Sequence, residues 1–184
     1  MTEEEKSVIT TTPRHPDTAF NFGPASALDE IVFTSERPGG DPPTKDAKIP
    51  ISTVQEWADF MKGRDIQHVL VLLDDHELEI YEEPGLLAKY EENGFRVHRN
   101  PMNGKGSVEN AEKILKSIAS ANEKVVCHCT HGMGRSGRVA AGWLVLQYGL
   151  TPQEATREAL QTSEIHGMER MGNVQALSTW LENK

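Results

Sequence analysis

Residues 125–137 read Val-Val-Cys-His-Cys-Thr-His-Gly-Met-Gly-Arg-Ser-Gly, and this run constrains the fold more than any other part of the chain. The stretch 124–127 leads in and predicts a strand, and the apolar stretch 139–146 leads out and predicts a helix. Between and just after them lie three glycines, Gly132, Gly134 and Gly137. A strand, a glycine-bearing loop and a helix N-terminus together point backbone N–H groups at an anion. The run therefore predicts an α/β fold with a phosphate-sized anion site at a strand end.

Cys129 and Arg135 frame this predicted loop. The guanidinium of Arg135 can grip two oxygens of a phosphate at once. A thiol at a helix N-terminus, ringed by N–H donors and near a fixed cation, is expected to be a thiolate at neutral pH, and so a nucleophile that needs no general base. A buried cysteine is more often a small core residue. That alternative leaves Arg135, Ser136 and the glycines unexplained.

The order His128-Cys129, five residues, Arg135-Ser136 resembles the signature of the cysteine-dependent protein phosphatases, the protein-tyrosine and dual-specificity superfamily. A weaker likeness in the order of elements covers about residues 20–182. The resemblance implies a phosphocysteine on Cys129, transition-state stabilisation by Arg135 and a hydrogen bond from Ser136 to the sulfur. It implies a supporting role for His128 behind the loop, and it implies no cofactor. The residues expected to bind phosphate are Thr130, His131, Gly132, Met133, Gly134 and Arg135.

The general acid departs from the family pattern. Relatives often carry an aspartate in a Pro-apolar-x-Asp setting, whereas residues 101–104 here read Pro-Met-Asn-Gly, which contains no proton donor of that kind. Asp74 and Asp75 follow an apolar strand-like run, so we expect them at the same sheet edge as the loop. The pair could instead start a loop or cap a helix. The Pro- and Gly-rich loop 36–50, with Asp41 and Asp46, offers another source of a carboxylate.

Two further residues have competing interpretations. Gln175 resembles the glutamine that positions water in the tyrosine-phosphatase branch, but an exposed helix glutamine is an equal alternative. Cys127 could be a small core residue or a resolving thiol for an oxidised Cys129, and the core role is favoured. A metal site is disfavoured, because the Cys-His-Cys-Thr-His run has no second pair of ligands.

The favoured function is hydrolysis of phosphate monoesters, aryl phosphates above all, on a phosphorylated protein or a small ester. One alternative is an RNA 5′-triphosphatase of the capping-enzyme type, because Thr130-His131-Gly132 resembles the loop of that branch, although Gly134 stands where that branch has asparagine. Another is a phospho-binding module of low activity. The net charge of −9 disfavours nucleic acids and anionic membranes as partners. Met133 offers no cation to an inositol phosphate.

Length and composition predict one soluble domain. The chain has 184 residues, of which 37% are hydrophobic and 26% charged. Residues 1–19 are predicted to be a mobile arm and residues 20–184 a single phosphatase domain. The sequence has no apolar run of about 18 residues, no visible secretory signal and only two cysteines, which are separated by one residue. A cytoplasmic location is therefore expected, and the sequence leaves the oligomeric state open.

Strand-like and helix-like segments alternate along that domain. Strands are predicted at 30–34, 68–73, 95–99 and 124–127, and helices at 52–62, 85–92, from 107, at 135–148, at 152–162 and over 171–181. Capping boxes are predicted for Ser52 with Gln55 and for Thr151 with Glu154. This alternation predicts a small, mostly parallel sheet of four or five strands with helices on both faces.

Overall fold

A computed structural model describes residues 8–9 and 16–183 and has the predicted α/β architecture. Its main sheet has five strands in the order β2-β3-β6-β4-β5. Strands β3, β6, β4 and β5 are parallel, and β2 is antiparallel to β3. The strands are β2 (Gly23–Pro24), β3 (Val32–Glu36), β4 (His68–Val71), β5 (Arg96–Arg99) and β6 (Val125–Cys129).

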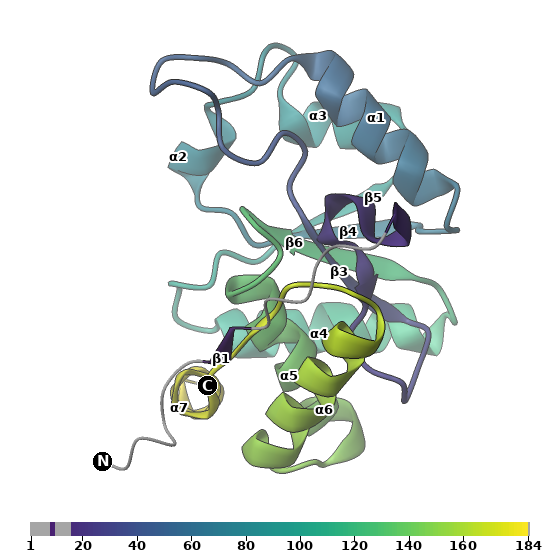
Figure 1. The fold of residues 1–184 in the computed structure, drawn as a ribbon, viewed down its shortest axis with the longest axis vertical. Coiled ribbons are helices and arrows are strands. Elements are labelled where there is room, and N and C mark those ends of the chain that lie inside the picture. Colours follow the sequence, from purple (N-terminus) through teal and green to yellow (C-terminus); the bar gives the residue numbers. More distant parts are fainter. Residues whose placement is uncertain (1–7, 10–15, 184) are drawn as a thin grey trace.

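Helices cover both faces of this sheet (Figure 1). One face packs against α1 (Ile51–Lys62) and α3 (Leu86–Glu92), and the other against α4 (Ser107–Ser120), α5 (Arg135–Tyr148), α6 (Pro152–Ile165) and α7 (Val174–Glu182). Neighbouring strand residues point to opposite faces. In β6, Cys127 and Cys129 therefore join the core under α4 and α5, whereas Val126 joins the core under α1 and α3.

Of the two capping boxes predicted from the sequence, one is present and one is not. Helix α6 has Thr151 as its N-cap, Pro152 in its first turn and the predicted capping box with Glu154. The capping box predicted for Ser52 and Gln55 is wrong. Pro50, in an extended conformation, is the N-cap of α1, so Ser52 already lies inside the helix, and the Gln55 amide binds Asp59 and Asn93 instead.

Five short elements were not predicted. They are β1 (Val8–Ile9), the 3-10 segment η2 (Pro16–Asn21), β2, α2 (Asp75–Leu78) and β7 (Met171–Gly172). Because β7 takes up the first residues of the helix predicted over 171–181, that helix, α7, begins only at Val174. Strand β1 pairs antiparallel with β7, and Thr18 in η2 donates a hydrogen bond to the Gly167 carbonyl. The predicted arm 1–19 thus contains two elements that contact the domain, and residues 1–7 and 10–15 of it lie outside the described residues. None of the described helices is long and apolar enough to cross a membrane.

Candidate active site

The run 129–136, called the signature loop below, lies at the carboxyl edge of the parallel sheet. Strand β6 ends at Cys129, directly beside Glu36 at the end of β3, and α5 starts at Arg135. Gly132 has a φ of +72°, and a Cβ atom there would lie 2.6 Å from the Glu36 nitrogen. Only glycine fits this turn without strain. The strand, loop and helix predicted from the sequence are therefore present in the predicted order.

Every carbonyl from residue 129 to residue 133 accepts a hydrogen bond from outside the loop. The Arg37 N–H donates to Cys129 O (2.9 Å) and Thr130 O (3.3 Å), the Asn21 Nδ2 donates to His131 O (3.2 Å) and Gly132 O (3.4 Å), and the Met171 N–H donates to Met133 O (3.2 Å). In a planar trans peptide the C=O and N–H groups point in opposite directions. The outward carbonyls therefore turn the N–H groups of residues 130–134 to the inside of the loop, and none of these N–H groups has an acceptor among the described residues. Inward N–H groups of this kind form a nest, an arrangement that can bind an anion.

Cys129 lies at the base of this nest. The residue is 4% exposed, and its Sγ atom lies 3.3 Å from the Oγ of the fully buried Ser136 in the first turn of α5. The Ser136 hydroxyl can donate to the sulfur, as the resemblance implies. The sulfur is thus placed where the loop N–H groups and the helix N-terminus converge.

Arg135 forms a two-point ion pair with Glu77, a residue that the sequence analysis did not single out. The Nη1 and Nη2 atoms of Arg135 lie 2.6 and 2.7 Å from the two carboxylate oxygens, and Thr130 Oγ1 donates to Glu77 Oε1 at 2.9 Å. Burial raises the pKa of Glu77, but hydrogen bonds from Arg135, the Asp74 N–H and Thr130 outweigh it and lower the pKa to about 2. Glu77 is therefore a fixed carboxylate that orients Arg135 and cannot serve as a proton donor near neutral pH.

The loop 36–50 also reaches the signature loop. Arg37, which is 5% exposed, lies 3.9 Å from Glu77 and 3.6 Å from Asp41, and the other oxygen of Asp41 lies 2.8 Å from His131 Nε2. The long loop was expected to be functional. The structure brings Asp41 of this loop into contact with His131 of the signature loop.

The two aspartates after β4 have different surroundings. Asp75 has a side chain that is 93% exposed and pairs with Arg99 at 3.0 Å, on the side of β5. Asp74 is the N-cap of α2 and accepts a hydrogen bond of 3.1 Å from Asn103, the residue in the stretch where relatives carry an acid. The pKa of Arg135 is raised, first by its hydrogen bonds to Glu77 and to a smaller extent by the charge of Asp74. Asp74 is connected to the signature loop through Glu77, because its N–H donates to the Glu77 carboxylate at 2.8 Å and that carboxylate binds Arg135, whereas Asp75 is paired with Arg99.

His128 lies behind the loop. It is fully buried, its Nε2 lies 3.1 Å from the Tyr90 hydroxyl, and its ring meets Trp57 edge-on. Burial lowers the pKa of His128 to about 3, so the ring is neutral. This geometry fits a supporting role.

The described contact of Gln175 lies within α7, and Cys127 lies in the core. Gln175 is exposed on α7, and its amide donates to Thr179 at 3.4 Å. Cys127 is fully buried, and burial raises the pKa of its thiol. Within the described chain, no group of three or more His, Cys, Asp and Glu side chains could hold a metal ion.

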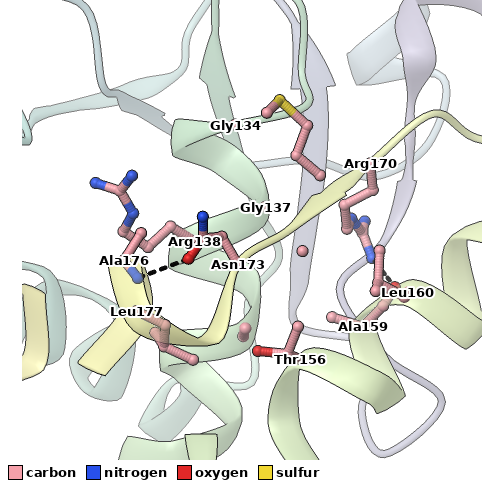
Figure 2. A pocket seen from close by; sticks show the side chains of 13 residues that line it. Gly134, Gly137, Arg138, Thr156, Ala159, Leu160, Arg170, Asn173, Ala176 and Leu177 are labelled. Carbon is pink, nitrogen blue, oxygen red and sulfur yellow. Dashed lines mark hydrogen bonds between the residues drawn. The ribbon is translucent and has the colours of Figure 1, made fainter. Parts of the chain in front are cut away.

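A cavity of about 90 Å³ lies between the start of α5 and helices α6 and α7 (Figure 2). Figure 2 shows Gly137, Thr156 and Leu177 among its lining residues. Neither Cys129 nor Arg135 lines it. Of the signature loop, Gly134 lines the cavity, so the cavity adjoins the loop at the start of α5.

Comparison with known proteins identifies the family of this chain. The family model of Cyclin-dependent kinase inhibitor 3 (CDKN3) matches residues 42–156. The chain belongs to the CDKN3 family. The Cyclin-dependent kinase inhibitor 3 proteins of Mus musculus and Homo sapiens are each 31% identical to it, over 107 and 108 residues. These matches cover 55% of this CDKN3-family chain and 51% of each relative, so the chain spans about half the length of the curated relatives it matches.

Solved structures share the fold. Kinase associated phosphatase (KAP), with its catalytic site cysteine replaced by serine, has a TM-score of 0.67 and 22% identity, and the match covers 94% of this chain and 95% of that one. Tk-PTP in the active form has a TM-score of 0.58 and 27% identity, covering 86% of this chain and 95% of that one. The resemblance to protein-tyrosine and dual-specificity phosphatases is thereby confirmed for family and fold.

Proposed function

We propose that this CDKN3-family chain hydrolyses phosphate monoesters through a phosphocysteine on Cys129, with aryl phosphates favoured. One observation carries the proposal: the Cys129 sulfur lies in a loop whose carbonyls are all held outward, so that its N–H groups face the position of a bound phosphate. The Ser136 hydroxyl lies 3.3 Å from the sulfur, and the Arg135 guanidinium is held at the start of α5 by Glu77.

The reaction proceeds in two displacements. The Cys129 thiolate attacks phosphorus, and the bond to the ester oxygen breaks. That oxygen keeps the electron pair and leaves as a phenolate, or as an alcohol when a general acid gives it a proton. The loop N–H groups and Arg135 stabilise the charge on the phosphoryl oxygens. Water then attacks the phosphocysteine, the S–P bond breaks, and the sulfur leaves as a thiolate that accepts a hydrogen bond from Ser136. Inorganic phosphate is released and the enzyme is regenerated.

The charges around the loop support a substrate with a single phosphate. The carboxylates of Asp41 and Glu77 contact the signature loop, and Asp74 adjoins Glu77 through its N–H. They would repel additional phosphates of a triphosphate-ended RNA or an inositol polyphosphate. The relatives are named for kinase inhibition and kinase association. We therefore propose a phosphorylated protein as the substrate.

A substrate panel on one preparation tests this proposal. The panel consists of a phosphotyrosine peptide, a phosphothreonine peptide, an inositol polyphosphate and triphosphate-ended RNA, with released phosphate as the readout. We expect the phosphotyrosine peptide to have the highest kcat/KM. Preferred release of the γ-phosphate from RNA would overturn the proposed substrate in favour of the RNA 5′-phosphatase alternative. Phosphate binding without turnover of any substrate would support a binding module instead.

We predict that Asp74 protonates the leaving group. Asp74→Asn should slow hydrolysis of an alkyl phosphate by roughly 10²- to 10⁴-fold, the usual contribution of a general acid. The rate on p-nitrophenyl phosphate should change little, because nitrophenolate leaves without a proton. The ratio of the two rates, measured for wild type and variant, is the readout.

Asp75→Asn is the matched control, since the same change is made one residue away on a side chain paired with Arg99. It should leave both rates near those of wild type. If the two variants behave alike, Asp74 is structural, and Asp41 beside His131 becomes the next carboxylate to substitute.

A further inference from the structure

We infer that Asn21 is a positioning residue that turns the amides of Gly132 and Met133 toward the bound phosphate. The inference deepens the proposed function and rests on it. Asn21 ends η2, about 110 positions before the signature loop, and its side chain is fully buried against that loop.

The side chain of Asn21 joins two backbone segments. Its Nδ2 donates to His131 O (3.2 Å), Gly132 O (3.4 Å) and Glu169 O (2.7 Å), and its Oδ1 accepts from the Glu169 N–H (2.8 Å). An amide nitrogen carries two hydrogens, so one serves Glu169 and the other is shared by the two loop carbonyls. The paired bonds to Glu169 fix which way the amide faces, because the Glu169 N–H needs the oxygen and the Glu169 carbonyl needs the nitrogen. The NH₂ group is thereby directed at the loop.

This contact decides the orientation of two peptide groups. The carbonyls of His131 and Gly132 belong to the same peptide planes as the N–H groups of Gly132 and Met133. Holding those carbonyls outward holds these two N–H groups inward. Gly132, at a φ of +72°, has backbone freedom that other residues lack, so its flanking peptides are the ones most able to rotate.

Asn21 differs from the other donors to the loop. The carbonyls of residues 129, 130 and 133 are held by backbone N–H groups of Arg37 and Met171, which no side-chain substitution removes. Among the described donors to the loop carbonyls, Asn21 is the one that acts through its side chain. The anion affinity of the loop is therefore sensitive to substitution at this position.

Asn21→Asp provides the sharpest test. The carboxylate keeps the shape and the acceptor for the Glu169 N–H, but it places an oxygen against the carbonyls of His131 and Gly132. We expect the affinity for inorganic phosphate, and kcat/KM with it, to fall roughly 10- to 100-fold, the scale on which buried acceptors lose a donor. A protonated carboxyl group has an O–H donor, so the loss should shrink as the pH is lowered. Asn21→Ala, which carries no charge, should show a similar loss that does not shrink with pH.

Thr18→Val is the matched control, because it removes a buried hydrogen bond between η2 and the 167–170 segment without touching the loop. Phosphate binding is measured by calorimetry, and folding by thermal unfolding. The inference is overturned if Asn21→Asp and Asn21→Ala, both folded, bind phosphate within about twofold of Thr18→Val. If wild type binds phosphate but turns over no ester, the proposed function fails, and the binding data still test the role of Asn21.

Discussion

Cys129→Ser is expected to abolish turnover and to leave phosphate binding intact. In the proposed mechanism the nucleophile is the sulfur, whereas the anion is held by the inward N–H groups of residues 130–134 and by Arg135, and the substitution changes none of these. A serine hydroxyl here has no base to take its proton, since the His128 ring behind it is turned to Tyr90. We expect a loss of roughly 10⁴- to 10⁶-fold in kcat, the scale seen when an enzyme loses its nucleophile.

Initial rates with p-nitrophenyl phosphate and calorimetric titration with inorganic phosphate measure the two effects separately. Cys127→Ser is the matched control, because Cys127 is a buried cysteine two residues earlier on the same strand. It should retain turnover if it stays folded. Substantial hydrolysis by Cys129→Ser, with contaminating phosphatases excluded, would contradict the assignment of the nucleophile.

Arg135→Lys is expected to lose roughly 10³-fold or more in kcat/KM, because an arginine that stabilises phosphoryl transfer contributes on that scale. Lysine keeps the charge but cannot bind Glu77 through two nitrogens and present a planar fork to a phosphate. Its ammonium would also remove one of the two hydrogen bonds that Arg135 donates to Glu77. Steady-state kinetics over a range of substrate concentrations provide the measurement.

Arg138→Lys is the control for this change. Arg138 lies three residues later on α5, is half-buried, and has no acidic partner among the described residues. The same substitution there should leave kcat/KM near that of wild type. Equal losses of kcat/KM at both positions would show that the substitution acts by disturbing helix α5 and not by removing the contact between Arg135 and phosphate.

The local parts of the fold were predictable from the sequence. The strand into the loop, helix α5 and the capped start of α6 depend on residues within a few positions of one another. The start of α1 was misplaced because the spacing of Ser52 and Gln55 predicted Ser52 as the N-cap. The N-cap is instead Pro50, two residues earlier, which has an extended conformation.

The parts of the site that depend on distant pairs were not predictable. Glu77 meets Arg135 across 58 positions, and Asn21 meets the signature loop across 110. A local signal for the region of Glu77 did exist, since Asp74 and Glu77 have capping-box spacing. That spacing could have revealed α2, but not the ion pair. Asp74 and Asp75 could not be told apart from sequence, because their directions depend on where this short helix begins.

Trapping the covalent intermediate tests the central claim most directly. The enzyme is mixed with radiolabelled substrate, quenched with acid during turnover, digested and analysed by mass spectrometry. We expect one phosphoryl group on the peptide that contains Cys129, bound to sulfur, and none in the Cys129→Ser variant. A phosphoryl group on His131 or another residue, or turnover with no labelled enzyme in a quench fast enough to precede hydrolysis, would contradict it.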